Sequence, residues 1–368
     1  MGKKHSLRIL VVSGASGGHI FPAFSFLDAL MADSNAECLL VLPGSSVVKP
    51  MLGKGWQVCY IPVYPLRLSL APSNLIRAIK LAAAFFISAA IVFGFRPQAI
   101  VGFGSIVCLP VFFWGKVFGA KAVIHEQNVL LGKANRLLAR WCDAIALSFE
   151  KTKICLGRHS AKAHLTGNPL RAALLQKTGR DEACGFFGFD KDKFTLLICG
   201  GSQGSSRING IVLSALALLP ERSGIRCIHL TGPSDYEQVK KAYEGLGIQA
   251  RVFPFLDHMQ YAYSCADLAV TRAGATTVAE LAHFAVPAII IPYPYAYRHQ
   301  ADNAAVLAEK GAAVVFRDDE LSAPLLKQVI IDFMGNPDKI ITMRKGFGGL
   351  TQENAAEKLL SLVKGLVS

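Results

Sequence analysis

The chain has 368 residues, of which 39 are basic and 26 acidic, and its formal net charge is +13 with histidine neutral. Domains of about 150 residues are typical, so this length predicts two domains. Hydrophobic residues make up 52% of the chain and charged residues 18%, which excludes intrinsic disorder. The mean hydropathy of +0.37 is high for a soluble protein and indicates contact with an apolar phase.

The excess positive charge is concentrated in the first part of the chain. Residues 1–167 carry 18 basic and six acidic side chains, whereas the remainder carries 21 and 20. A basic domain is typical of proteins that bind nucleic acid, an anionic membrane or a phosphorylated substrate. The sequence contains no recognition helix, RNP-type aromatic motif or zinc knuckle, so nucleic acid is not an expected partner. The nine cysteines form no CxxC pair and are typical of reduced thiols.

Short apolar runs separated by helix-length segments predict alternating strands and helices. The first run, Leu7–Val12, precedes a glycine-rich loop and a helix over 19–31. Further strands of the first series are expected at 38–42, 99–101, 122–124 and 144–148. A second series is expected at Phe194–Cys199, 226–230, 250–253, Leu268–Thr271 and 288–291. Two such series predict an α/β protein with two doubly wound parallel-sheet domains.

The boundary between the domains is expected after Gly167, where an Asn-Pro pair disfavours helix. This gives a first domain over 1–167 and a second over 168–349. From its residues alone, the last helix, over 354–367, fits either domain.

One segment of the first domain is unusually apolar. Residues 81–95 carry no charge and lie between Lys80 and Arg96. Ser73 is positioned to cap the helix that leads into this segment, with Leu75, Ile79 and Phe86 near one face. Such a helix fits a membrane interface, with basic side chains at the headgroups. A buried core helix is the main alternative, and a transmembrane span is a third, although about 20 apolar residues are usual there.

Three glycine-rich turns connect predicted strands to helices, at 14–18, 200–204 and 273–277. In such turns, backbone N–H groups at a helix N-terminus approach a ligand and favour phosphate. None matches the Walker loop or the dinucleotide fingerprint. Two of these turns in one domain and one in the other suggest a diphosphate ligand.

Polar side chains also follow predicted strands, at the sheet edge where α/β proteins bind ligands. These segments are His-Glu-Gln-Asn at 125–128 and a stretch over 298–303. Glu280 fits either a capping box begun by Thr277 or a carboxylate that accepts two hydrogen bonds from a ribose diol. The single DxD motif, Asp190 to Asp192, is expected to be a solvated turn, so no metal site is predicted.

Five ordered motifs resemble those of the MurG family of peripheral membrane glycosyltransferases. They are GASGGHIFPA (14–23), HEQN (125–128), GNPLR (167–171), GGSQG (200–204) and RAGATTVAE (272–280), with RHQ at 298–300. The resemblance covers nearly the whole chain and implies a GT-B fold, in which two Rossmann-like domains face a cleft. It also implies that the last helix, within 350–368, returns to the first domain.

The activity implied by this resemblance belongs to peptidoglycan synthesis at the cytoplasmic face of the bacterial inner membrane. The family transfers N-acetylglucosamine from UDP-N-acetylglucosamine to the C4 hydroxyl of undecaprenyl-diphospho-N-acetylmuramoyl-pentapeptide. The partners implied are therefore the nucleotide sugar, the undecaprenyl-linked lipid acceptor and an anionic membrane surface.

The resemblance also implies roles for individual residues. On the donor side, the backbone of Leu256 would contact uracil and Glu280 the ribose diol. The diphosphate contacts would be Ser202, Gln203, Ala275, Thr276 and Thr277, with positive charge added by Arg171. Sugar hydroxyls would be read by Gln300 and Asn128. The acceptor diphosphate and the reaction centre would be faced by Ser16, Gly17, Gly18 and His19.

The implied reaction is a single inverting displacement, which requires a base at the acceptor hydroxyl. His19 is the first candidate and Glu126 the second, while His19 also fits a phosphate-binding or helix-capping role. No metal or cofactor is needed if helix N-termini and Arg171 stabilise the leaving diphosphate.

The sequence departs from the family at the GxGGY motif, which is Gly-Phe-Gly-Ser-Ile over 102–106. This leaves open a related enzyme with another lipid acceptor, such as diacylglycerol. A UDP-N-acetylglucosamine 2-epimerase and a non-catalytic nucleotide-sugar binder are further alternatives.

Overall fold

The computed structural model describes residues 6–33, 35–44, 56–63, 72–201, 203–222, 224–295 and 298–368, with the side chains of 72–78 left out. The chain divides into two compact units. Unit 1 comprises Met1–Arg171 with Gln352–Ser368, and unit 2 comprises Ala172–Thr351. Unit 1 ends four residues after the boundary expected at Gly167, and the last helix lies in unit 1.

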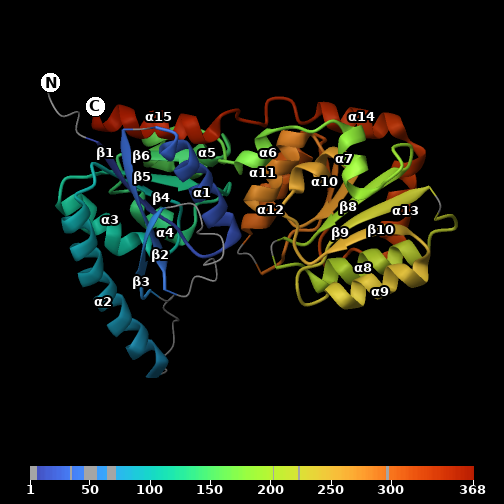
Figure 1. Ribbon diagram of the computed structural model, residues 1–368, viewed down its shortest axis with the longest axis horizontal. Coiled ribbons are helices and arrows are strands. Elements are labelled where there is room, and N and C mark those ends of the chain that lie inside the picture. The colour runs from blue at the N-terminus through green and yellow to red at the C-terminus, as the bar shows by residue number, and fades with distance from the viewer. Residues whose placement is uncertain are drawn as a thin grey trace. The chain divides into compact units, whose positions relative to one another are not determined.

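Unit 1 contains a seven-stranded parallel sheet in the order β3-β2-β1-β4-β5-β6-β7 (Figure 1). Its strands are β1 Leu7–Val12, β2 Ala36–Pro43, β3 Gln57–Ile61, β4 Ala99–Gly102, β5 Lys121–Glu126, β6 Ala144–Leu147 and β7 Ala163–Leu165. Its helices are α1 Gly17–Met31, α2 Pro72–Phe95, α3 Cys108–Val117, α4 Lys133–Leu138, α5 Thr152–Cys155 and α15 Ala355–Val367, with a 3₁₀ helix, η2, at Gly157–Lys162.

Unit 2 contains a six-stranded parallel sheet in the order β10-β9-β8-β11-β12-β13. Its strands are β8 Phe194–Cys199, β9 Ile225–Leu230, β10 Gln249–Phe253, β11 Leu268–Thr271, β12 Ala288–Ile290 and β13 Ala313–Val315. Its helices are α6 Ala172–Leu175, α7 Arg180–Phe187, α8 Ser206–Ala217, α9 Tyr236–Leu246, α10 Met259–Cys265, α11 Ala275–Phe284, α12 His299–Ala308, α13 Ala323–Gly335 and α14 Pro337–Lys345.

In both sheets the strand order reverses at one point. The chain turns from β1 to β2 on one side and to β4 on the other, and from β8 to β9 and β11 in the same way. Loops that leave the carboxyl ends of the two central strands therefore diverge, which opens a place for a ligand in doubly wound folds. All three glycine-rich turns follow a central strand, β1, β8 or β11.

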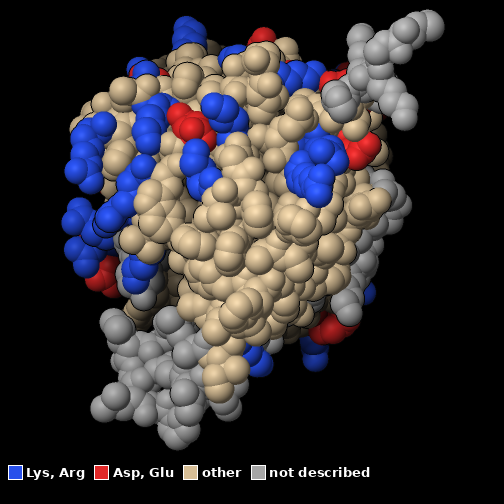
Figure 2. Space-filling view, turned by 90° about the vertical axis from the view of Figure 1, so that its left-hand side faces the viewer, with Lys and Arg blue, Asp and Glu red and all other residues tan. Residues whose placement is uncertain are grey.

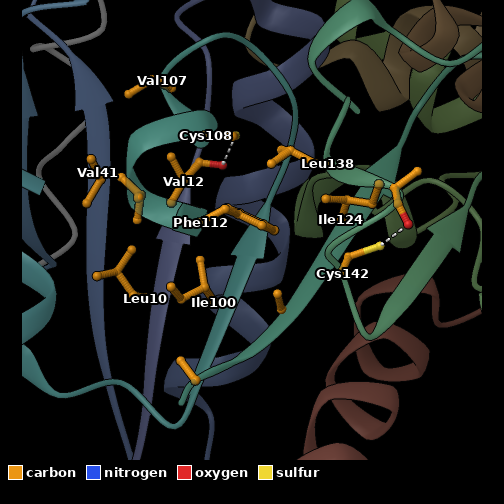
Figure 3. Packing of buried hydrophobic residues seen from close by; sticks show 14 of the residues in the cluster. Leu10, Val12, Val41, Ile100, Val107, Cys108, Phe112, Ile124, Leu138 and Cys142 are labelled. Carbon is orange, nitrogen blue, oxygen red and sulfur yellow. Dashed lines mark hydrogen bonds between the residues drawn. The ribbon is translucent and has the colours of Figure 1, made fainter. Parts of the chain in front are cut away.

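The core of unit 1 lies on both faces of its sheet. On one face, side chains from β1, β2, β4 and β5 converge with Phe112 of α3 (Figure 3). On the other face, Ile9 of β1 and Phe26 of α1 pack with Leu359 and Val363 of α15. Because these four side chains are fully buried, α15 is part of the core of unit 1.

The apolar helix α2 has a buried side and an exposed side. It begins at Pro72, so Ser73 lies within its first turn and is not its cap, a correction to the sequence-based expectation. Ala84, Ser88 and Val92 recur every four residues and are fully buried. Ile79, Phe86 and Phe93 recur every seven residues and are 60%, 76% and 58% exposed. Helix α2 is therefore not a core helix that is buried on all sides. No helix of the described ranges is long and apolar enough to cross a membrane.

Candidate functional site

The loop between β8 and α8 in unit 2 requires glycine. Gly204 has a φ of +78°, and a Cβ there would lie 2.0 Å from the carbonyl oxygen of Thr231. Gly232 has a φ of +79°, and a Cβ there would lie 2.3 Å from the carbonyl oxygen of Gln203. The loops after β8 and β9 are thus in backbone contact, which only residues without a Cβ permit. Gln203 is exposed at this loop, whereas Ser202 lies outside the described residues.

The N-terminus of α11 presents unpaired donors. Its N-cap is Gly274, which provides no side-chain cap for the first backbone N–H groups, those of Ala275, Thr276 and Thr277. The hydroxyl of Thr276 is buried and has no hydrogen-bond partner within the described part of the chain. No acidic side chain lies in the first turn. Backbone donors, a helix dipole and an unused hydroxyl together favour an anion.

Glu280 lies inside α11 and is not part of a capping box. The helix begins at Ala275, so Thr277 is not its N-cap, and the capping alternative is wrong. The Glu280 side chain is 8% exposed, and its Oε2 accepts a hydrogen bond of 2.7 Å from the hydroxyl of Tyr263. Its negative charge contributes to a raised pKa of Cys199, about 11, after burial as the main cause. This carboxylate therefore lies near the carboxyl end of β8.

Arg272 joins several loops of unit 2, a role that the sequence analysis missed. Arg272 is buried, with 6% of the residue exposed. Its guanidinium forms an ion pair with Asp318 and donates to the hydroxyl of Ser205 at 3.2 Å and to the carbonyl of Ile291 at 3.0 Å. Arg272 thus connects the loops after β8, β11 and β12. The motif RAGATTVAE begins with Arg272, but no feature of the sequence indicates that its partner is Asp318.

Gln300 braces the loop that leads into α11. Its Oε1 accepts hydrogen bonds from the backbone N–H groups of Ala273 at 3.1 Å and Tyr293 at 2.8 Å. Asn303, fully buried on the same helix, donates to the carbonyl of Ala273 at 3.1 Å. The side-chain Oε1 of Gln300 therefore has a structural role. The side-chain nitrogen, Nε2, takes no part in these two hydrogen bonds.

In unit 1, His19 lies between two glycine loops. Its Nδ1 is 2.9 Å from the hydroxyl of Ser16, which precedes α1. Its ring packs so closely on Gly14 and Gly104 that a Cβ at either glycine would lie within 3.1 Å of a ring nitrogen. Gly17 and Gly18 form the first turn of α1, and Gly18 is exposed. The loops after β1 and β4 therefore fix the orientation of the imidazole.

The loop after β4 keeps a glycine-type backbone although it lacks one of the expected glycines. Gly104 has a φ of +87°, and Ser105 has a φ of +78°. A left-handed conformation costs a residue with a side chain roughly 1–2 kcal/mol. Ser105 thus changes the residue in the GxGGY motif without removing the left-handed turn.

We expect Ser105→Gly to raise the free energy of unfolding by about 1 kcal/mol, because glycine removes this backbone strain. Denaturant unfolding of the full chain measures the effect. Ser105→Ala removes the hydroxyl but keeps the strain, so it is the matched control and should gain nothing. Equal stabilisation by both variants would contradict the strain.

Glu126 is saturated with hydrogen bonds. The carboxylate is 1% exposed and accepts from the backbone N–H of Asn128 at 3.0 Å and of Gly132 at 2.9 Å. It also accepts from the side-chain amides of Asn128 at 3.1 Å and Asn135 at 2.9 Å. Four donors fill the acceptor sites of a carboxylate. These contacts favour a role for Glu126 in shaping the loop after β5 and in orienting Asn128, rather than as a base.

His125 and Gln127 are also used internally. The Nε2 of His125 is 2.9 Å from the carbonyl of Gly167, and burial lowers the pKa of His125 to about 4. Gln127 donates to the carbonyl of Phe103 at 3.3 Å. Of the HEQN segment, only Asn128 is partly exposed. The HEQN segment is therefore mainly a scaffold that presents Asn128.

The two remaining residues predicted to bind the nucleotide are Leu256 and Arg171, which lie in different units. Leu256 is buried in the loop that follows β10. The guanidinium of Arg171 lies 5.1 Å from the ring centroid of Phe21, and its Nε is buried without a hydrogen-bond partner among the residues described.

In the described part of the chain, no group of three or more His, Cys, Asp or Glu side chains could hold a metal ion.

Comparison with protein families assigns both units. Residues 9–147 match the glycosyltransferase family 28 N-terminal domain, and residues 195–360 match the glycosyltransferase family 28 C-terminal domain. A protein of Desulforudis audaxviator is 32% identical over 373 residues, 98% of each chain. One of Halalkalibacterium halodurans is 33% identical over 365 residues, 97% of this chain and 99% of the relative. Both are named UDP-N-acetylglucosamine–N-acetylmuramyl-(pentapeptide) pyrophosphoryl-undecaprenol N-acetylglucosamine transferase.

The chain belongs to this family of N-acetylglucosamine transferases, the MurG family. Its fold is that of a GT-B glycosyltransferase, as predicted. The crystal structure of Acinetobacter baumannii MurG superposes with a TM-score of 0.77 at 24% identity and covers 98% of this chain and 99% of that one. A putative UDP-N-acetylglucosamine 2-epimerase of Listeria monocytogenes gives a TM-score of 0.70 at 12% identity, with 98% and 96% covered. The fold alone is therefore shared between the MurG family and the epimerases.

Proposed function

We propose that this chain transfers N-acetylglucosamine from UDP-N-acetylglucosamine to the C4 hydroxyl of undecaprenyl-diphospho-N-acetylmuramoyl-pentapeptide, with inversion at the anomeric carbon. The observation that carries the proposal is α11: an uncapped N-terminus with an unused hydroxyl, and a buried carboxylate on the same helix. A nucleoside diphosphate offers the matching groups, a diphosphate and a ribose diol. The names of the relatives supply the sugar and the acceptor.

In this mechanism, unit 2 binds the donor. The N–H groups at the start of α11 and the loop after β8 stabilise the negative charge that develops on the leaving diphosphate. Glu280 accepts hydrogen bonds from the ribose hydroxyls, and Tyr263 keeps its carboxylate in place. Leu256 contacts uracil through its backbone, and the amide of Gln300 binds a sugar hydroxyl. We expect this reaction to need no metal, because the backbone N–H groups provide the positive potential.

Unit 1 supplies the base. His19 takes the proton of the acceptor hydroxyl through Nε2, while Ser16 accepts a hydrogen bond from Nδ1–H and so fixes the tautomer. The N-terminus of α1, with Gly17 and Gly18, receives the diphosphate of the lipid acceptor. Asn128 binds a sugar hydroxyl, held by Glu126.

A radiolabelled transfer assay tests the proposal. The full chain is given UDP-N-acetylglucosamine and either the undecaprenyl-linked acceptor or diacylglycerol. We expect label in the first product only. Ile106, at the tyrosine position of the GxGGY motif, favours the second candidate, an enzyme with a different lipid acceptor. Label in the diacylglycerol product alone would establish that candidate instead.

Loss of the Glu280 charge should weaken nucleotide binding. We expect Glu280→Gln to raise the Kd for UDP roughly thirtyfold, since a hydrogen bond to a charged group contributes about 2 kcal/mol. Calorimetric titration with UDP measures the change. Asp318→Asn alters the partly exposed carboxylate that pairs with Arg272 on another loop. This control shows how much of the change in Kd comes from local rearrangement of the loops alone. An unchanged Kd in Glu280→Gln would exclude the ribose contact.

We further propose that the chain is a peripheral protein of the cytoplasmic face of the bacterial inner membrane. Exposed apolar side chains of α2, of α3 and of the residue after α3 form a surface that is named the apolar face below. Its members are Ile79, Phe86, Ile87, Phe93, Phe113, Val117 and Phe118. Figure 2 shows a broad uncharged area on the same side of the molecule as a dense group of Lys and Arg side chains. An apolar surface bordered by positive charge favours an anionic lipid interface.

Polar substitution should release the protein from membranes. We expect the double variant Ile79→Ser, Phe86→Ser to bind vesicles that contain phosphatidylglycerol about tenfold more weakly or worse, because two apolar side chains no longer enter the lipid. Sedimentation with vesicles measures this. Leu218→Ser with Ile341→Ser is the control, since these residues of unit 2 are each 50% exposed. Equal losses in both variants would exclude the apolar face as the docking surface.

A further inference from the structure

A cavity in unit 1 lies at the far end of the loop after β5, where Leu130 and Leu131 precede α4. Its volume is about 220 Å³, and it is formed where α4, α5 and η2 meet. Arg136, Arg140, Arg158 and His159 line it together with apolar side chains that include Leu131 and Leu156. The cavity is large enough for a small polar group but not for a whole lipid or nucleotide.

The three arginines of this cavity have no counter-ion in the part of the chain that the structure describes. None of their guanidinium groups has a hydrogen-bond or ion-pair partner among the described residues. The acids that flank α4 and α5 in sequence are already paired, Glu150 with Lys153 and Asp143 with Lys116. Loss of water contact lowers the pKa of His159, and neighbouring positive charges, Arg158 foremost, lower it further. Cations that converge without an acid repel one another, and an anion would remove that repulsion.

Exposed apolar side chains lie on the same elements as the arginines. Leu137 of α4 is 51% exposed, Trp141, which follows α4, is 50% exposed, and Ile154 of α5 is 82% exposed. Trp is favoured at the boundary between lipid and water, where its ring is partly apolar and partly polar. A phosphate bound in the cavity would therefore have apolar surface beside it, as a phospholipid headgroup requires.

We propose that the cavity between α4, α5 and η2 binds the phosphate of an anionic phospholipid headgroup, held by the guanidinium groups of Arg136, Arg140 and Arg158. The planar guanidinium forms paired hydrogen bonds with phosphate oxygens, which an ammonium group does not. Trp141 and Ile154 contact the acyl region beside the headgroup. The proposal rests on membrane association and adds a specific lipid contact to it.

The first test separates a specific site from diffuse charge attraction. We expect the triple variant R136K/R140K/R158K, which keeps the charge, to bind phosphatidylglycerol vesicles roughly tenfold more weakly than the unaltered chain, since it loses the paired hydrogen bonds. The matched control replaces three arginines outside the cavity, R207K/R222K/R317K in unit 2, and should bind normally. Normal binding by the cavity variant would overturn the proposal.

The second test uses a thiol of the cavity as a reporter. Cys155 lines the cavity, and it is the one exposed cysteine of the nine in the chain. Vesicles with phosphatidylglycerol should slow its alkylation by iodoacetamide at least several-fold, and phosphatidylcholine vesicles and inorganic phosphate should not. Protection by inorganic phosphate with none by vesicles would show a site for soluble phosphate and overturn the lipid assignment. Absence of all protection would overturn the site.

Failure of this proposal can be distinguished from failure of the proposed function. Transfer to a detergent-solubilised acceptor needs no vesicle, so the lysine variant should transfer N-acetylglucosamine at the normal rate in detergent. Loss of lipid binding with normal transfer in detergent supports the headgroup site. A chain that binds vesicles through this cavity but transfers no sugar would instead refute the enzymatic activity.

Discussion

Replacement of His19 by Gln is expected to reduce kcat by roughly 10²- to 10⁴-fold, because general base catalysis contributes a factor of this size. The KM for both substrates should change little. The fall in rate on the acidic side of the pH profile should also disappear, since it reports protonation of the base. Steady-state kinetics from acid to alkaline pH, with the undecaprenyl-linked acceptor, measure all three quantities.

The alternative role of His19 predicts a different kinetic result. If the imidazole binds the acceptor diphosphate, His19→Gln should raise the acceptor KM and leave both kcat and the shape of the pH profile nearly unchanged. Ser16→Ala is a useful companion variant, because it removes the hydroxyl 2.9 Å from Nδ1 but leaves the ring in place. A smaller decrease of kcat in Ser16→Ala than in His19→Gln is expected for a base whose tautomer is fixed by Ser16.

Gly204→Ala should have the largest effect among substitutions in unit 2. The new Cβ would lie 2.0 Å from the carbonyl oxygen of Thr231, and the φ of +78° is unfavourable for alanine. Strain and overpacking together should cost about 3 kcal/mol or more of unfolding free energy. Because the loop after β8 must move to relieve the clash, we also expect UDP to bind at least tenfold more weakly. Thermal unfolding and calorimetric titration measure the two effects.

Gly201→Ala provides a matched control for the clash. Gly201 lies in the same loop with a φ of +97°, but no described residue other than its chain neighbours lies within 4 Å of the position of its Cβ. This variant should therefore show the backbone strain of about 1 kcal/mol without the steric contact. Similar losses in both variants would mean that the contact between the two loops has no special importance.

Much of the fold follows from local sequence pattern. The runs Leu7–Val12, Phe194–Cys199 and Leu268–Thr271 are strands with the expected bounds, because a strand buried on both faces is continuously apolar. The strands β3, β7 and β13 were missed. β7 and β13 have only three residues each, and β3 and β7 are partly exposed, so their apolar pattern is weak. Membership of α15 in unit 1 could not be derived from its own residues, since it depends on packing against α1.

In the candidate site, too, local features can be predicted from the sequence, whereas contacts between distant residues cannot. Glycine loops and helix N-termini are visible in the sequence, because glycine and strand ends are local features. The partners of a buried charge are not local. Glu126 lies beside Asn128 in sequence, but its saturation depends on Gly132 and Asn135 as well. Likewise, nothing in the sequence near Arg272 indicates Asp318, 46 residues further along the chain.

The position of α15 has a consequence for synthesis on the ribosome. Unit 1 is interrupted in sequence by the whole of unit 2, and Leu359 and Val363 complete the core around Ile9 and Phe26. Unit 2 is contiguous and can fold as soon as it emerges. Helix α1 covers part of the same face of the sheet, but the part that α15 covers stays exposed until the final helix has been made. While unit 2 is being translated, a nascent chain of this protein therefore exposes the part of its first sheet that α15 will later cover. This is the period in which a chaperone would be most useful.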